Sequence, residues 1–234
     1  MTISQIQSGF ILINKQTGIS SHTVVNRLRR ITSIRKIGHA GTLDPLASGL
    51  MILAIGRDAT RKIDQYVKLD KEYIATLHLG AETDTYDREG EVINVDPNFS
   101  DRKIDEKIIQ EILNKFLGEQ DQIPPMFSAK KVNGQKLYDL ARKGIEIERK
   151  PSRINIYNIE FIIYSSPLLK IKIKCSSGTY IRSIAFDFGR ALGCGAYLEA
   201  LERTEIGEFK IEKSFKLEEL DSGNWAEKVL RVVS

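Results

Sequence analysis

The stretch that constrains the fold most is a glycine-rich segment at residues 38–49, GHAGTLDPLASG, which the apolar run LMILAI at residues 50–55 follows directly. Glycine permits positive φ and close approach of other groups, while Pro45 fixes the backbone just after Asp44 and removes one N–H donor. The segment therefore predicts a rigid turn that holds Asp44 in one position. Two interpretations stay open: an ordinary turn in which Asp44 bonds its own backbone, or a site in which its carboxylate meets another molecule.

Size and composition are those of a folded protein. The 234 residues are 41% hydrophobic and 28% charged, which suffices for one sizeable core, and we expect one domain over residues 1–234. No apolar stretch reaches the length of a signal-peptide core or a membrane span, so we expect a soluble cytoplasmic protein without membrane association. The two cysteines, Cys175 and Cys194, are far apart and the three histidines are scattered, which argues against a metal site or a disulfide framework.

Positive charge is concentrated in two places. Residues 130–153 carry eight basic and three acidic side chains, and a second basic group at residues 27–36 directly precedes the glycine-rich segment. A solvated helix face explains either group alone. Two such groups near one candidate site indicate a polyanionic partner such as a nucleic acid.

Hydrophobic periodicity predicts alternating helices and strands. Strands are expected at 9–14, 51–55, 71–79, 91–95, 153–164, 168–175 and 198–209, and helices at 21–31, 59–66, 104–116, 137–142, 179–192 and 217–232. The 91–95 strand is expected to return antiparallel to the 71–79 strand. Because short turns join most consecutive strands, we expect an α/β (α+β) fold with a largely antiparallel sheet and helices packed on it. The double proline and glycines at 124–153 suggest a protruding arm.

Several motifs together resemble one family. Residues 38–49 are similar to the catalytic motif of the tRNA pseudouridine 55 synthases, the TruB family. Further blocks follow in that family's order: Asn14-Lys15 with Gly18, Lys71-Glu72-Tyr73, Leu79-Gly80 with Thr83-Asp84-Thr85, Pro124-Pro125 with Phe127-Ser128-Ala129-Lys130, Gly178-Thr179-Tyr180-Ile181-Arg182, and Leu192-Gly193-Cys194-Gly195-Ala196. The resemblance implies the pseudouridine synthase fold, a mixed and largely antiparallel sheet flanked by helices, with a thumb-like arm at about 124–153.

The resemblance also implies a reaction that needs no cofactor and no metal. One uridine in the T-loop of tRNA, at position 55, loses its C1′–N1 bond, turns over and is rejoined through C5. Asp44 matches the essential aspartate. A carboxylate has a reference pKa of ~3.9, so it is ionised at neutral pH and can act as nucleophile or base. Whether it first meets C1′, the C2′ hydrogen or C6 stays open.

Four other residues match the family's substrate pocket. Arg182 matches the arginine that pairs with the aspartate, and a carboxylate in a closed pocket requires such a partner to stay ionised. Tyr73 matches the tyrosine that stacks on the uracil, and Tyr180 and Leu201 match residues lining the pocket. Without the family, Arg182 reads as a solvated helix residue, Tyr73 as a core aromatic, and the other two as ordinary packing. The family usually has two arginines after this leucine, whereas here Glu202 precedes Arg203.

The remaining matches concern the RNA. His39 matches a histidine that fills the space left by the flipped nucleotide, although a histidine in a loop is commonly a surface residue. Asp87 matches an acidic residue at the pocket rim, which turn chemistry also explains. We expect four basic residues to contact the RNA backbone of the T-arm stem-loop: Lys15, Lys130, Arg142 and Arg149.

The resemblance leaves three functional hypotheses. The first is a monomeric tRNA pseudouridine synthase that needs no protein partner. Because the sequence ends soon after the catalytic motifs, we expect no C-terminal PUA domain and weaker RNA affinity than in longer relatives. The second is a tRNA-folding chaperone that does not depend on catalysis. The third, an RNA glycosidase that releases free uracil, is disfavoured by the pocket-lining residues.

Overall fold

The computed structural model describes residues 8–128, 130–132, 134–141, 144–145 and 147–230. These residues form two compact units. The first comprises residues up to 73 and from 202 onward, and the second comprises residues 74–201. Strands β4 (Lys71–Leu79) and β12 (Ala196–Ile206) have residues in both units. The chain therefore leaves the first unit along β4 and returns to it along β12.

The first unit is built on strands β1 and β3, which pair antiparallel from Gly9 opposite Ile55 to Lys15 opposite Gly49. Strand β2 pairs antiparallel with β3, and the end of β12 runs parallel to β3, with Arg203 opposite Gly49. Apart from β12 and the start of β4, the elements are β1 (Gly9–Lys15), α1 (Ser21–Thr32), β2 (Ile37–His39), β3 (Ser48–Ile55), α2 (Gly56–Val67), β13 (Phe209–Lys210) and the 3-10 turns Ile211–Lys213, Leu217–Glu219 and Trp225–Lys228.

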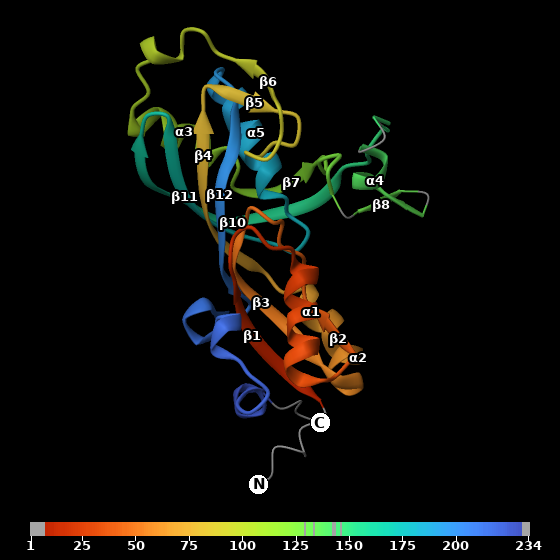
Figure 1. Cartoon of the computed structure of the whole chain (residues 1–234). Coiled ribbons are helices and arrows are strands. Elements are labelled where there is room, and N and C mark those ends of the chain that lie inside the picture. The colour runs from red at the N-terminus through yellow and green to blue at the C-terminus, as the bar shows by residue number, and fades with distance from the viewer. Residues whose placement is uncertain (1–7, 129, 133, 142–143, 146, 231–234) are drawn as a thin grey trace. The chain divides into compact units, whose positions relative to one another are not determined.

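Apolar burial explains these elements. Every residue of β3 after Ser48 is buried, as the apolar run predicts. Helix α1 begins after Ser20, whose side chain accepts a hydrogen bond from the Thr23 N–H, which confirms the expected cap. In Figure 1, α1 and α2 lie beside β1 and β3. One buried cluster of this unit consists of Phe10, Leu12, Ala40, Leu50, Ile52, Ala54, Ala59 and Ile206.

The second unit contains a sheet in the order β12-β4-β11-β10-β7. Strand β10 is antiparallel to both β11 and β7, and every second residue of β4 is buried, which confirms the predicted half-buried strand. Besides the parts of β4 and β12 that lie here, the elements are β5 (Ala81–Thr83), β6 (Val92–Val95), the 3-10 turn Phe99–Asp101, α3 (Glu106–Asn114), β7 (Gly118–Gln122), β8 (Lys131–Val132), β9 (Gln135–Lys136), α4 (Leu137–Ala141), β10 (Ser152–Ser165), β11 (Leu168–Cys175) and α5 (Ile181–Leu192). The expected mixed α/β class with a mostly antiparallel sheet is confirmed.

Two strand predictions were incomplete. Strand β7, with sequence GEQDQ, was not predicted, because it is polar and is held by its antiparallel pairing with β10. Strand β6 pairs with β5, whereas the sequence suggested β4 as its partner. The chain turns at Gly80 with φ of +93°, where a side chain would overlap the Phe99 ring, so β5 departs from the line of β4.

The predicted helix at 217–232 is wrong for its described part. Only two 3-10 turns form, and between them the Asp221 carboxylate accepts hydrogen bonds from the N–H groups of Gly223 and Asn224. Such a side-chain-to-backbone turn competes with helical hydrogen bonding and ends the regular structure there. None of the described helices is long and apolar enough to span a membrane.

Candidate active site

The backbone on both sides of Asp44 is held by contacts with distant segments of the first unit. The Ser21 hydroxyl lies 2.8 Å from both the N–H and the carbonyl oxygen of Leu43, accepting from one and donating to the other. The Pro45 carbonyl accepts a hydrogen bond of 2.8 Å from the Gly18 N–H, and the Asp44 carbonyl accepts one from the Ala47 N–H. Asp44 itself is half-buried. The rigid turn predicted around Asp44 is confirmed.

Lys15 does not lie where an RNA-backbone contact requires it. Its side chain is completely buried, and its Nζ donates to the carbonyl oxygens of Gln16 and Ile19 and, at 3.4 Å, to that of Pro45. A buried ammonium group that bonds three carbonyls cannot reach a phosphate. Lys15 instead supports the turn that follows β1 and the residue after Asp44.

His39 ends β2 and is half-buried. Burial lowers the pKa of this histidine below its usual value, a hydrogen bond with the Gly41 backbone opposes the shift, and the charges of Arg203 and His22 add to it. The imidazole is therefore neutral at neutral pH. A neutral, flat side chain at the start of the glycine-rich segment is compatible with contact to a nucleobase.

Tyr73 lies near the end of the first unit's share of β4 and is 8% exposed. Burial lowers the pKa of the Arg203 guanidinium, and its interaction with Tyr73 opposes this shift. The Arg203 Nε and Nη2 groups donate to the carbonyl oxygens of Leu50 and Gly41, at 2.7 and 3.2 Å. The glycine-rich segment is thus held by an arginine that sequence reasoning did not select.

Arg182 is a candidate residue of the second unit. It lies in the first turn of α5, and its side chain is 6% exposed. Its Nη1 lies 3.3 Å from the Asp87 carboxylate and 3.1 Å from the Thr85 carbonyl, and its Nη2 donates to the Phe127 carbonyl at 2.7 Å. A solvated helix arginine is excluded by this burial. The predicted pairing of Arg182 with Asp44, which belongs to the first unit, stays a prediction.

Asp87 takes part in the turn chemistry that the sequence suggested, and its expected place at the pocket rim stays a prediction. Its carboxylate accepts hydrogen bonds from the Thr85 hydroxyl at 2.8 Å and the Glu89 N–H at 3.0 Å, which is turn chemistry, and it also pairs with Arg182. The preceding residue, Tyr86, has φ of +63° and stacks on Phe186 with 4.0 Å between ring centroids. Strain at such a position persists only where neighbours impose it, so this turn is tightly fixed.

Tyr180 and Leu201 are both half-buried in the second unit. Tyr180 directly precedes α5, and its backbone exchanges two hydrogen bonds of 2.8 and 3.0 Å with the side-chain amide of the buried Gln122. Gln122 ends β7, the strand that was not predicted. The start of α5 is therefore anchored to the edge of the sheet, and this anchor fixes the backbone next to Arg182.

The arm at 124–153 contains the β8–β9 hairpin and α4, which Figure 1 shows beyond β7 and outside the strands of the sheet. Lys130 donates to the Ser152 hydroxyl at 2.5 Å, and Arg149 donates to the Pro124 carbonyl at 3.3 Å. Both side chains are half-buried and stabilise the base of the arm. Arg142 lies outside the described residues.

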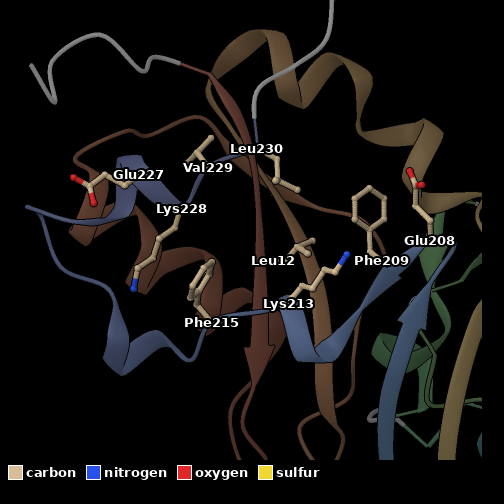
Figure 2. A pocket seen from close by; sticks show the side chains of 9 residues that line it. All are labelled: Leu12, Glu208, Phe209, Lys213, Phe215, Glu227, Lys228, Val229 and Leu230. Atoms are coloured by element: carbon tan, nitrogen blue, oxygen red, sulfur yellow. The ribbon is translucent and has the colours of Figure 1, made fainter. Parts of the chain in front are cut away.

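One cavity of about 410 Å³ lies in the first unit, away from the predicted site residues. Figure 2 shows the side chains that line it: Leu12, Glu208, Phe209, Lys213, Phe215, Glu227, Lys228, Val229 and Leu230. None of them was selected from the sequence. Among the described residues, no three His, Cys, Asp or Glu side chains gather as a metal-binding group.

The fold is similar to that of a solved protein. A chain in the crystal structure of a Cbf5-Nop10-Gar1 complex superposes with a TM-score of 0.72 and 30% sequence identity, over 93% of this chain and 55% of the other. The present chain thus spans about half the length of that solved chain. This likeness confirms the expected pseudouridine synthase class of fold.

Sequence comparison defines the family within that class. The family model for the N-terminal domain of TruB family pseudouridylate synthases matches residues 29–181, and the model for the tRNA pseudouridylate synthase B C-terminal domain matches residues 182–233. Proteins named tRNA pseudouridine synthase B from Francisella philomiragia and Protochlamydia amoebophila are 46% and 49% identical in sequence to the present chain. These matches cover 97% and 87% of this chain, and 74% and 76% of the relatives. The chain belongs to the TruB family.

Proposed function

We propose that this protein is a tRNA pseudouridine synthase that isomerises uridine 55 in the T-loop. The C1′–N1 bond breaks, the base turns over, C1′ bonds to C5, and the hydrogen on C5 is replaced by one on N1, so the product is an isomer of the substrate. Membership of the TruB family and the names of the relatives support the reaction. Asp44 is the catalytic residue.

The observation that carries this proposal is the support of the Asp44 backbone. Ser21 binds Leu43 on one side, and Gly18 and Lys15 bind Pro45 on the other. A carboxylate on so fixed a backbone loses little conformational freedom when it meets the ribose or the base, and such positioning lowers the activation barrier. An ordinary surface turn does not need three distant partners.

Arg182 provides the positive charge that keeps the Asp44 carboxylate ionised in a closed pocket. Its pairing with Asp87 and two backbone carbonyls leaves the guanidinium little freedom, which supports a role in orienting the aspartate. A fork of five N–H donors can serve two carboxylates at once.

Three further residues receive the extruded uridine, and His39 contacts the RNA that the uridine leaves. Tyr73 stacks on the base, and stacking holds a detached base without fixing which edge faces C1′. Tyr180 and Leu201 line the pocket. His39, neutral because of its burial, fills the space that the flipped nucleotide leaves in the RNA. Unstacking costs a few kcal/mol, part of which this wedge offsets.

The arm binds the T-arm stem-loop through phosphate contacts, and recognition depends on the shape of the loop. Lys130 and Arg149 contribute from the base of the arm, and Arg142 from within it. Lys130 and Arg149 are each only half-buried, so part of each residue stays accessible to the RNA. We propose a monomeric, cytoplasmic enzyme of one domain that acts without a protein partner, metal or cofactor.

The test uses an unmodified tRNA transcript and a matched transcript with cytidine at position 55. The full chain is expected to convert the first at position 55 only and to leave the second unchanged, as mapped by pseudouridine-specific chemical labelling. Asp44→Ala is expected to form no product. Conversion at another position, release of free uracil, or wild-type conversion by Asp44→Ala would each contradict the proposal.

The chaperone hypothesis is distinguished by the same aspartate. Asp44→Asn removes the charge with little change in shape, so an enzyme loses product formation while tRNA binding persists. If the variant still refolds misfolded tRNA at the wild-type rate, the chain has a folding activity in addition to catalysis.

A further inference from the structure

The turn at residues 83–88 of the second unit holds a tyrosine in an unfavourable backbone conformation. Tyr86 has φ of +63°, in the left-handed region, which costs a residue with a side chain roughly 1–2 kcal/mol. Its N–H donates to the Thr83 carbonyl at 3.2 Å, and its carbonyl accepts from the Leu198 N–H at 2.9 Å. Glycine adopts this conformation without the cost, so an aromatic residue here indicates a use for the ring itself.

The Tyr86 ring lies on Phe186 of α5, with 4.0 Å between the ring centroids and 19° between the ring planes. The Arg190 guanidinium lies 4.3 Å from the centre of the same Phe186 ring, and it also lies 3.6 Å from the Glu82 carboxylate. Two groups so close to one ring cannot share a face, so Phe186 is held between Tyr86 and Arg190. Phe186 is 8% exposed and therefore has little freedom to move away from the tyrosine.

The two residues that flank Tyr86 both contact Arg182. The Thr85 carbonyl accepts from the Arg182 Nη1 at 3.1 Å, and the Asp87 carboxylate lies 3.3 Å from the same nitrogen. In an extended strand a carbonyl lies in the plane of the sheet and a side chain stands perpendicular to it, so the two would not converge. The left-handed turn at Tyr86 brings them together. Phe186 follows Arg182 by one helical turn, so one face of α5 contacts the turn twice.

We propose that Tyr86 is a positioning residue: its ring, stacked on Phe186, holds the turn in the conformation that aims both flanking acceptors at Arg182. This rests on the proposed function, in which the Arg182 guanidinium orients the Asp44 carboxylate. A guanidinium carries five N–H donors in a rigid fork, so acceptors that fix one nitrogen also fix the direction of the others. Tyr86 therefore acts through Arg182 and not on the nucleotide.

The alternative is that the backbone hydrogen bonds of Tyr86 hold the turn and that its ring only covers Phe186. Three variants of the full chain separate the two explanations. Tyr86→Gly removes the ring and the strain and keeps both backbone hydrogen bonds, Tyr86→Ala removes the ring and keeps the strain, and Tyr86→Phe loses the hydroxyl alone. Single-turnover pseudouridine formation on an unmodified tRNA transcript gives the rate, and the tRNA Kd is measured on the same preparation.

Displacement of a reacting group by about 1 Å costs on the order of 100-fold in rate, so we expect Tyr86→Gly and Tyr86→Ala to lose about 10- to 100-fold. Tyr86→Phe should keep the wild-type rate, because the proposal uses the ring and not the hydroxyl. The tRNA Kd should stay unchanged, since Tyr86 is not among the proposed RNA contacts. A wild-type rate for Tyr86→Gly, a slow Tyr86→Phe, or an equal loss of affinity and rate would overturn the inference.

Phe186→Ala removes the other ring of the stack, and its combination with Tyr86→Ala completes a double-mutant cycle. Because both changes break one contact, the double variant should be about as slow as the slower single variant, and fully multiplied losses would overturn the inference. Tyr197→Ala is the matched control, since Tyr197 belongs to another stacked pair of the second unit, with 4.8 Å between its ring centroid and that of His78. Its rate should equal that of the wild type; an equal loss there would contradict the inference.

Two further outcomes distinguish the inference from the proposed function. If the Phe186 variants do not fold, Tyr86→Gly decides alone, because glycine relieves the strain and leaves Phe186 in place. If the wild-type chain forms no pseudouridine, the proposed function fails and the inference fails with it. An active wild type with an unaffected Tyr86→Gly variant refutes the inference and leaves the proposed function standing.

Discussion

Arg182 and Arg203 are both buried arginines, one in each unit, but their surroundings differ. Arg182 faces the Asp87 carboxylate at 3.3 Å and two backbone carbonyls. Arg203 donates to two backbone carbonyls, and among the described residues no carboxylate forms an ion pair with it. An ion pair within its unit thus compensates the charge of Arg182, whereas no ion pair with a described residue compensates that of Arg203.

This difference indicates different purposes. Because a carboxylate compensates its charge, Arg182 belongs to a buried polar network in which removal of one ion leaves the other unpaired. Arg203 forms no ion pair with a described residue, so its removal costs hydrogen bonds but leaves no described carboxylate unpaired. Substitutions at the two arginines should therefore differ more in their effect on the free energy of unfolding than in their effect on the rate of the proposed reaction.

The largest effect is expected for Arg182→Met. It leaves the Asp87 carboxylate, which is 6% exposed, without its partner, and breaking a buried pair costs about 3–5 kcal/mol in the free energy of unfolding. The second change Asp87→Asn removes the stranded charge and should restore part of the loss. Urea unfolding of the three proteins measures both values. A double variant no more stable than Arg182→Met would contradict the claim that the unpaired Asp87 charge causes the loss.

Arg203→Met should cost less, about 2–3 kcal/mol, because it leaves the buried Leu50 carbonyl and the half-buried Gly41 carbonyl short of a donor and breaks no ion pair between described residues. The same urea titrations give the value. A loss equal to that of Arg182→Met would show that Arg203 is compensated as Arg182 is, and would remove the distinction between the two sites.

Ser21→Ala should lower stability by about 1–2 kcal/mol, since the hydroxyl satisfies both the N–H and the carbonyl of Leu43. It should also slow pseudouridine formation, because Leu43 fixes the backbone before Asp44. Ser20→Ala is the matched control: it removes the α1 cap, at a cost of ~1 kcal/mol, and should leave the rate unchanged. Equal rates for the two variants would argue against positioning by Ser21.

The smallest effect concerns the titration of His39, whose pKa is lowered mainly by burial and to a lesser extent by the charge of Arg203. Burial lowers the folded-state pKa of His39 below its usual value of 6.5, so the unfolded chain binds the proton first as the pH falls. The stability that neutral His39 contributes is present above pH 6.5 and is lost as the pH falls toward the lowered pKa. His39→Gln should flatten this fall, by at most about 1.4 kcal/mol per pH unit. Urea unfolding at pH 7.5 and 5.5 should show the smaller change in the variant; identical changes would contradict it.

Regular elements with strong periodicity could be predicted from the sequence. The alternation in β4, the cap of α1 and the start and end of α5 follow from local patterns and lie close to their expected positions. The polar strand β7 could not be found in this way, since only its pairing with β10 defines it. The 217–232 helix failed because the Asp221 side chain takes up backbone N–H groups locally.

The candidate site likewise contains residues that the sequence could identify and contacts that it could not. Asp44, Tyr73 and Arg182 were selected because they lie in motifs, and the structure places Arg182 in a buried network that no pattern showed. Arg203 meets Gly41 across 162 positions of sequence, and Ser21 meets Leu43 across 22. Neither contact has a local signal. The burial of Lys15 corrected the expectation of an RNA contact, since one lysine in a basic protein gives no sign of facing inward.

The central claim is that the Asp44 carboxylate performs the chemistry on a backbone built to hold it. The most direct measurement is single-turnover pseudouridine formation at position 55 by Asp44→Asn, with tRNA binding measured on the same preparation. The account predicts no detectable product with tRNA affinity retained. Product formation by Asp44→Asn at the wild-type rate would contradict it.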